Sequence, residues 1–188
     1  RIYQNGDDYQ EAMRYYLTAE KYALAAHKNY YLGLVYSRIG EVYSEQMNFN
    51  GALEYYRNAY GAWEKLRNPA FMNNATLNIA NAYSSLGDND NAVKYYSQAL
   101  QAAVQQEDND MVIACLSNLG DIYVETEQYA KALEKYLETR RLSVILEKHE
   151  AISTGNLALA YYHLGKKGLA EQYFIAVSYT HLTLPTIA

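Results

Sequence analysis

Three asparagines recur at equivalent places along the chain and offer the clearest candidate chemistry. Asn78, Asn118 and Asn156 each directly precede a Leu or Ile that is followed by a Gly or Ala. A carboxamide both donates and accepts hydrogen bonds, so a row of them could hold the backbone of an extended peptide with little regard to its side chains. In the alternative interpretation, the three asparagines bond neighbouring helices and only stabilise the fold. We call these residues the asparagine ladder.

Further polar residues share the side of the predicted helices that lies opposite their apolar stripe. Together with the ladder they make up our predicted peptide-binding residues, which are Arg38, Glu41, Asn74, Asn78, Asn81, Asn118, Asp121, Glu125 and Asn156. The carboxylates outnumber Arg38, which predicts an acidic surface that attracts a basic protein or peptide, with an attraction that weakens in salt. The alternative is an ordinary solvated helix face. This set does not resemble a clamp for a terminal carboxylate, because such a clamp needs several basic residues and the set contains only Arg38.

Catalytic or metal chemistry finds little support in the sequence. The histidines His27, His149, His163 and His181 are scattered, without metal-ligand spacing on a helix. The segment Gly165-Lys166-Lys167-Gly168 lacks the frame of a phosphate loop, and its position predicts a turn between helices. Cys115, the single cysteine, lies next to an apolar stripe, which predicts a buried thiol. We therefore expect no enzyme, no cofactor and no metal.

Equivalent residues recur at a constant spacing of forty, which indicates one structural unit repeated along the chain. The columns are Ala12, Ala52, Ala92 and Ala132; Tyr16, Tyr56, Tyr96 and Tyr136; Tyr3, Tyr43, Tyr83 and Tyr123; and Gly40, Ala80 and Gly120. A fifth copy follows two residues early, with Ala158, Tyr161, Ala170 and Phe174. The small residues allow close helix approach, and the tyrosines are expected to fill the core beside them.

The sequence of each repeat predicts two amphipathic helices joined by a short turn. In the fourth repeat, one apolar stripe spans residues 116–123 and a second spans residues 132–137. In the third repeat, Gly87 suits the left-handed position that ends a helix, and Asp88 or Asn89 can cap the next one. Asn68-Pro69 is a comparable helix start. The sequence therefore predicts an all-α chain of helix pairs.

The repeated pattern resembles the tetratricopeptide repeat. The resemblance rests on Ile39-Gly40-x-x-Tyr43 followed by Ala52-x-x-x-Tyr56, and on Leu119-Gly120-x-x-Tyr123 followed by Ala132-x-x-x-Tyr136. The period exceeds the ~34 residues of the standard repeat. The tryptophan usual in the first helix is replaced by Tyr36, Thr76, Leu116 and Thr154, and the proline usual near the repeat end is absent. Long repeats of this kind are similar to those of kinesin light chains, cell-polarity adaptors and bacterial peptide-pheromone receptors.

This resemblance implies a right-handed superhelical solenoid of antiparallel helix pairs, whose first helices line a concave groove. It also implies that asparagines at the ladder position hold peptide backbone, as they commonly do in long-repeat relatives. We expect residues 1–177 to form about four and a half repeats, truncated at both ends. Residues 178–188 break the pattern, and we expect a non-repeat tail of foreign sequence, with a native linker as the alternative.

Composition narrows the class of partner. The chain has 188 residues, of which 50% are hydrophobic and 20% charged, and a formal net charge of -5. The negative charge argues against nucleic acid as a partner of this segment. No apolar run is long enough to span a membrane, so we expect no membrane partner either. The chain begins at Arg1 inside a repeat, which leaves its compartment and its oligomeric state open.

Two functions agree with these observations. The first is a protein–protein interaction scaffold that binds an extended peptide or a partner helix in its groove. The second is a sensory or regulatory repeat module of a bacterial signalling protein, with a transcription-factor or kinase output outside this sequence. The similarity to peptide-pheromone receptors motivates the second function.

Overall fold

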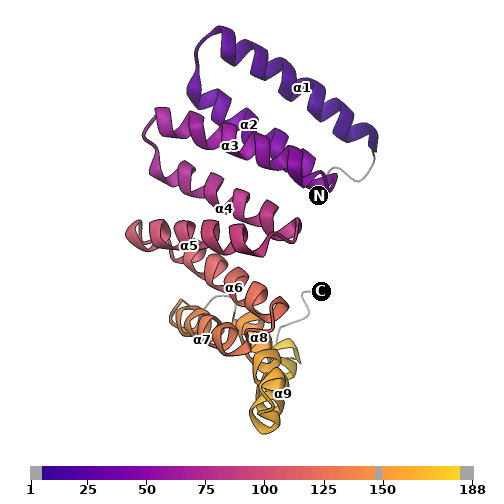
Figure 1. Ribbon diagram of the computed structural model, residues 1–188, viewed down its shortest axis with the longest axis vertical. Helices are drawn as coiled ribbons and strands as arrows, with labels where there is room; N and C mark the ends of the chain where they lie inside the picture. Colours follow the sequence, from indigo (N-terminus) through magenta and orange to yellow (C-terminus); the bar gives the residue numbers. More distant parts are fainter. Residues whose placement is uncertain (1–5, 147–149, 183–188) are drawn as a thin grey trace. The chain divides into compact units, whose positions relative to one another are not determined.

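The computed structural model describes residues 6–146 and 150–182. In these two ranges the chain forms nine α-helices and no strand (Figure 1). The helices are α1 (Gly6–Ala25), α2 (Asn29–Glu45), α3 (Phe49–Lys65), α4 (Pro69–Ser85), α5 (Asn89–Gln105), α6 (Asn109–Glu125), α7 (Tyr129–Ile145), α8 (Glu150–His163) and α9 (Lys167–Leu182). Helices α2, α4, α6 and α8 are the first helices of successive repeats, and α1, α3, α5, α7 and α9 are the second helices.

The helices keep one length through most of the chain. Each helix from α2 to α7 has 17 residues. Three residues separate each helix from the next between α2 and α7. A helix and its turn therefore take twenty residues, which accounts for the forty-residue period. The predicted all-α class of helix pairs is confirmed.

The turns share one backbone geometry. Their middle residues, Met47, Arg67, Gly87, Glu107 and Glu127, all have φ between 51° and 73°. In the turn after α4, the Gly87 N–H donates to Ser84 O at 2.9 Å and the Asp88 N–H donates to Tyr83 O at 3.0 Å. This pair of bonds satisfies carbonyls at the helix end, as in a Schellman motif. The left-handed conformation predicted for Gly87 is confirmed.

Side-chain caps begin several of the helices. The side chains of Asn48, Asn68 and Asp108 each accept a hydrogen bond from a backbone N–H in the first turn of the following helix. Asp88 does the same for Asn91. The predicted start at Asn68-Pro69 is therefore confirmed, and so is Asp88 as a cap.

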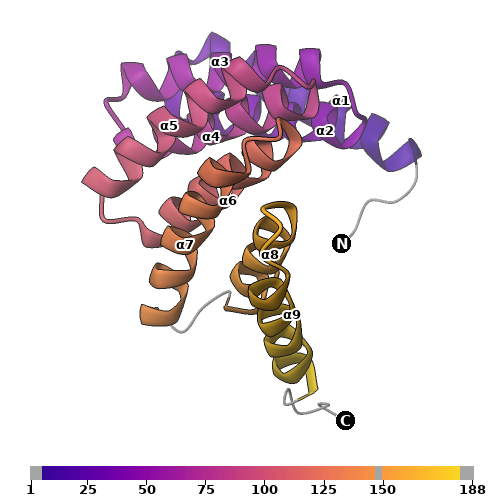
Figure 2. The same cartoon turned by 60° about the horizontal axis from the view of Figure 1, so that its bottom comes forward.

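The chain divides into two compact units, residues 1–102 and 103–188, with the division inside α5. In the first unit α1 packs on α2, α2 on α3, and α3 on α4. Helices α4 and α5 meet through the stacked rings of Tyr83 and Tyr95, whose centroids are 5.4 Å apart. In the second unit α6 packs on α7, α7 on α8, and α8 on α9, and the last pair lies side by side in Figure 2.

Glycines and tyrosines fit together in the cores of both units. A Cβ atom added at Gly40 would lie 2.5 Å from the Tyr56 ring, and one at Gly120 would lie 2.3 Å from the Tyr136 ring. Both tyrosines are buried. The predicted role of this tyrosine column as core is therefore confirmed.

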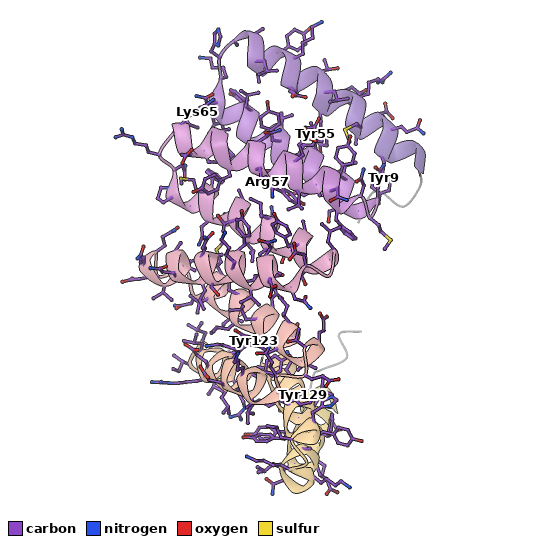
Figure 3. The ribbon with its side chains drawn as sticks, viewed as in Figure 1. Tyr9, Tyr55, Arg57, Lys65, Tyr123 and Tyr129 are labelled. Carbon is purple, nitrogen blue, oxygen red and sulfur yellow. The ribbon has the colours of Figure 1, made fainter. Side chains whose placement is uncertain are left out.

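Other aromatic residues differ in their burial and in their ring contacts. Trp63 is buried, and its ring stacks on that of Phe71 in the next repeat with the ring centroids 4.5 Å apart. Tyr15 is exposed. Tyr55, labelled in Figure 3, is half-buried and stacks on Tyr43 at 5.5 Å, just as Tyr95 stacks on Tyr83. The rings of Tyr55 and Tyr95 therefore pair inside the first unit, whereas the side chain of Tyr15 is open to solvent.

The last helix extends past the predicted end of the repeats. Helix α9 runs to Leu182, five residues beyond position 177. Residues 183–188 lie outside the described part, so the boundary at 177 and the foreign origin of the tail stay predictions. Among the described residues, no helix combines enough length with enough hydropathy to cross a membrane.

Candidate functional site

The predicted peptide-binding residues all lie on first helices. In the first unit, Arg38 and Glu41 lie on α2, while Asn74, Asn78 and Asn81 lie on α4. In the second unit, Asn118, Asp121 and Glu125 lie on α6, and Asn156 lies on α8. Each unit therefore contains two of these first helices.

On α2 the two predicted residues pair with each other. An Nη1 atom of Arg38 donates to Glu41 Oε2 at 2.7 Å, and both side chains are exposed. The bond to Glu41 raises the pKa of Arg38. The pair therefore presents little net charge to a partner.

On α4 the asparagines differ in their contacts. Asn74 Nδ2 donates to Ala70 O of its own helix at 3.1 Å. Asn81 Oδ1 accepts a hydrogen bond from the Tyr96 hydroxyl of α5 at 2.6 Å. Asn78, the ladder residue between them, is half-buried.

On α6 a buried tyrosine holds a carboxylate at the surface. The Tyr136 hydroxyl of α7 donates to Asp121 Oδ1 at 2.5 Å, and Asp121 itself is exposed. Burial, followed by the hydrogen bond and the charge of Asp121, raises the pKa of Tyr136. Glu125 lies exposed one turn further along the helix. Asp121 and Glu125 therefore bring negative charge to this part of α6.

The remaining ladder residues, Asn118 and Asn156, are half-buried like Asn78. None of the three asparagines belongs to the buried core. Peptide binding requires this, because a fully buried amide could not reach a partner. Half-burial also agrees with the alternative, in which the amides bond neighbouring helices. The role of the ladder thus stays a prediction.

The sequence analysis missed the tyrosine hydroxyls as partners of the site. Tyr96 and Tyr136 follow Asn81 and Asp121 by the same fifteen residues, and Tyr56 follows Glu41 by this number. Burial raises the pKa of Tyr56 to about 12, with a further contribution from Glu41. The constant spacing was the signal that could have revealed these contacts.

The histidines, the cysteine and the glycine-containing turn that the sequence analysis considered for catalysis form no common site within the described residues. Cys115 is fully buried, and its burial raises the pKa of the thiol to about 12. Residues 165–168 form the turn into α9, with Gly165 at φ 73°, as predicted. His163 stacks on Tyr129 at 4.6 Å, and the side chains of His149 and His181 lie outside the described residues. Within the described part, no three His, Cys, Asp or Glu residues are grouped to hold a metal ion.

The first helices therefore carry amides and carboxylates, which can form hydrogen bonds with a peptide. A family model of the tetratricopeptide repeat matches residues 71–143. Residues 71–143 therefore form tetratricopeptide repeats. The resemblance predicted from Gly120, Tyr123, Ala132 and Tyr136 is thus confirmed over this range.

Known proteins resemble this chain in part of their sequence or in their fold. Over 68 residues the chain is 38% identical to protein O-mannosyl-transferase TMTC1 from Homo sapiens. The matched residues make up 36% of this chain and only 7% of that protein. The structure of BtubC from P. vanneervenii superposes with a TM-score of 0.81 at 20% identity, covering 95% of this chain and 74% of BtubC. The Rap conjugation gene regulator of the plasmid pLS20, solved in complex with a Phr peptide, superposes with a TM-score of 0.70 at 17% identity. That match covers 91% of this chain and 48% of the regulator.

Proposed function

We propose that this segment is a protein-interaction scaffold that holds an extended peptide against its first helices. The observation that carries the proposal is the half-buried asparagine on each of α4, α6 and α8. A half-buried amide is oriented by its neighbours and still reachable, so it can bond a peptide without a large ordering cost. The Rap regulator, which has the same fold, was solved with a peptide bound, and this similarity supports the proposal.

Charge on the first helices differs between repeats and favours a basic partner at α6. Glu41 is neutralised by Arg38, and the equivalent Asn81 is uncharged. Asp121 accepts a bond from the neutral Tyr136 and has no ion-pair partner among the described residues. A Lys or Arg of the peptide would therefore gain most beside Asp121 and Glu125.

A peptide-library capture tests the ladder. We expect the double variant Asn78→Ala with Asn118→Ala to lose capture, because each lost hydrogen bond costs about 1–3 kcal/mol of binding. The control is Asn58→Ala with Gln98→Ala, which removes two exposed amides from the second helices α3 and α5. Capture unchanged in the ladder variant would remove the asparagines from the proposed site.

A second experiment tests the charge. Asp121→Asn with Glu125→Gln should weaken binding of Lys- or Arg-containing peptides and flatten its salt dependence. Glu54→Gln with Glu64→Gln, on exposed positions of α3, removes the same charge elsewhere and should change neither. If both pairs lowered affinity equally, only the net charge of the chain would matter.

A sensory module of a bacterial signalling protein is the second candidate function. Its support is the fold shared with a peptide-bound conjugation gene regulator. The test is the gene sequence around this segment: a DNA-binding or kinase domain favours regulation, and other interaction domains favour a scaffold.

We assign no catalytic role, nucleic-acid partner or membrane partner to this segment. The expectation of no catalytic role comes from the sequence, in which we could name no acid–base or nucleophilic constellation. A screen for hydrolase activity, combined with metal analysis of the purified protein, tests it, and any turnover that follows the protein would contradict it.

A further inference from the structure

The interface between α7 and α8 differs chemically from its counterparts in the first unit. Such an interface joins a second helix to the first helix of the next repeat, and it occurs between α1 and α2, between α3 and α4, and between α7 and α8. We compare two positions in the C-terminal half of the second helix and one in the N-terminal half of the first helix, allowing for the two-residue offset of the fifth repeat. They are Ala19, Ala23 and Val35; Ala59, Trp63 and Ala75; and Thr139, Ser143 and Ser153. Of the three interfaces, the one between α7 and α8 carries hydroxyls at these positions.

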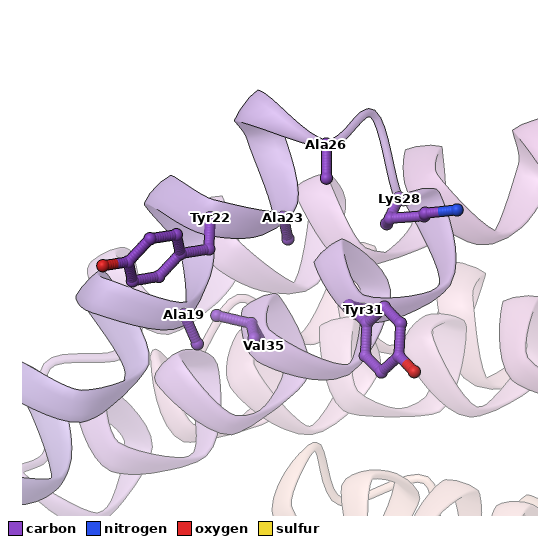
Figure 4. Close-up of a pocket in the computed structure, with 7 residues that line it drawn as sticks. All are labelled: Ala19, Tyr22, Ala23, Ala26, Lys28, Tyr31 and Val35. Atoms are coloured by element: carbon purple, nitrogen blue, oxygen red, sulfur yellow. The ribbon is translucent and has the colours of Figure 1, made fainter.

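In the first unit the compared positions are apolar. The side chains of Ala59, Trp63 and Ala75 are at most 2% exposed and form one buried cluster. Their counterparts in α1 and α2 line a pocket of about 340 Å³, in which Ala19, Ala23 and Val35 are labelled (Figure 4). Removing apolar side chains from water favours the docking of one helix on the next. In these two interfaces, the compared residues therefore hold the helices together.

The hydroxyl-bearing residues are equally buried, but they contribute little to docking. Thr139, Ser143 and Ser153 are at most 2% exposed. The Thr139 hydroxyl donates to Lys135 O within α7 at 3.0 Å, so this bond remains when α8 moves away. The Ser143 hydroxyl and the Nε atom of Arg140 are buried without a hydrogen-bond partner among the described residues. Docking therefore removes these two groups from water without replacing the lost hydrogen bonds, which opposes it.

The other half of the same interface is apolar and well packed. The N-terminal half of α7 and the C-terminal half of α8 share one buried cluster. Its members are Ala132, Tyr136, Leu157 and Ala160. Tyr161 of α8 stacks on Tyr173 of α9 with the ring centroids 5.4 Å apart, and the guanidinium carbon of Arg140 lies 5.6 Å from the centroid of the Tyr173 ring. These contacts anchor α9 and the C-terminal half of α8 on α7.

We propose that the N-terminal half of α8, residues 150–156, detaches from α7 while the C-terminal half of α8 stays docked. Ser153 belongs to the polar part of the interface and Leu157 to the apolar cluster, so the two halves meet beside Asn156. Local openings of this kind occur where few apolar contacts hold a segment. The opening itself is independent of peptide binding. Its consequence, that Asn156 keeps its place in the asparagine ladder only while this half is docked, rests on the proposed function.

Native-state hydrogen exchange of the full chain, followed by NMR, tests the proposal. In α8 the amides of residues 154–157 report on the N-terminal half, and those of residues 160–163 report on the C-terminal half. We expect the first group to exchange about tenfold faster than the second, or more. Ser143→Ala should slow the exchange of residues 154–157 by about tenfold, because docking then no longer buries an unpaired hydroxyl. The exchange of residues 160–163 should stay unchanged.

A matched variant places the same hydroxyls one repeat earlier in the second unit. Ala103→Ser with Cys115→Ser changes the positions equivalent to Ser143 and Ser153, and both residues are fully buried. Exchange of residues 116–119 of α6 should become about tenfold faster, with residues 154–157 unchanged. Should this variant fail to fold, Ser143→Ala decides alone.

Three results would overturn the proposal. The first is equal exchange in the two halves of α8 in the unaltered chain, because the helix would then open as a whole. The second is a Ser143→Ala variant that slows exchange in both halves alike or in neither. The third is a folded serine variant that accelerates exchange equally from α6 to α9, or nowhere, because buried hydroxyls would then not act on one half of a helix.

Discussion

The third repeat (α4 and α5) and the fourth repeat (α6 and α7) use the same backbone frame with different side chains. Both have two 17-residue helices and a turn whose middle residue is left-handed. Ala80 of the third repeat occupies the position equivalent to Gly120 of the fourth repeat, and Asn81 the position equivalent to Asp121. The buried alanines Ala99 and Ala103 of α5 correspond to Thr139 and Ser143 of α7.

This comparison separates what the frame requires from what each repeat adds. Small residues and a buried tyrosine occur in both repeats, so they belong to the packing. The charge of Asp121 and the buried hydroxyls of α7 occur only in the fourth repeat. We therefore expect substitutions that exchange residues between the repeats to have unequal effects on stability.

The largest effect is expected at the glycine column. Gly120→Ala should lower the free energy of unfolding by about 2 kcal/mol, because the new Cβ would overlap the buried Tyr136 ring at 2.3 Å. Ala80→Gly should cost about 1 kcal/mol for a different reason, the greater backbone freedom of glycine. Urea unfolding measures both. A Gly120→Ala variant as stable as the unaltered chain would contradict this prediction, because the fourth repeat would then accommodate an alanine at the position where the third repeat has Ala80.

The tyrosine hydroxyls should come next. Tyr136→Phe removes a hydrogen bond to a carboxylate and should cost about 1.5 kcal/mol, while Tyr96→Phe removes a bond to a neutral amide and should cost about 1 kcal/mol. Both variants keep the ring, so urea midpoints report the bond itself. Equal losses would mean that the charge of Asp121 adds nothing to the contact.

A gain in stability is expected on α7. The Ser143 hydroxyl is buried and has no hydrogen-bond partner within the described residues. Ser143→Ala should therefore raise the free energy of unfolding by about 1 kcal/mol, and Ala103→Ser on α5 should lower it by a similar amount. Thermal unfolding of both variants is the check, and a loss on Ser143→Ala would indicate a bound water or another partner for the hydroxyl.

The smallest effect is expected at the turns. Glu127 has φ 58°, where glycine is favoured, and Gly87 occupies the same place in the third repeat. Glu127→Gly should gain about 0.5 kcal/mol and Gly87→Glu should lose about 1 kcal/mol. Differential scanning calorimetry can resolve the two signs, and changes of the same sign would contradict this account of the turns.

Periodicity made the helix pairs predictable, because a stacked unit must repeat its small and aromatic residues at one spacing. Gly87 and Asn68-Pro69 could also be predicted, since their backbone preferences act locally. The left-handed Met47, Arg67, Glu107 and Glu127 could not, because here the fixed three-residue turn overrides the residue's own preference.

The candidate site was predictable only in part. The helical period was sufficient to select Asn78, Asn118 and Asp121 as residues outside the core. It could not reveal that Tyr136 bonds Asp121 or that Tyr96 bonds Asn81, since those contacts depend on how two helices face each other. Whether the ladder amides contact a peptide depends on a partner that the sequence does not contain.

The most direct measurement is an amide NMR titration of the chain with a peptide selected from a library. Our account predicts that the shifts concentrate on the first helices, around Asn74–Asn81 of α4 and Asn118–Glu125 of α6. Shifts confined to the exposed faces of α3, α5 and α7 would contradict it, because the peptide would then bind the second helices.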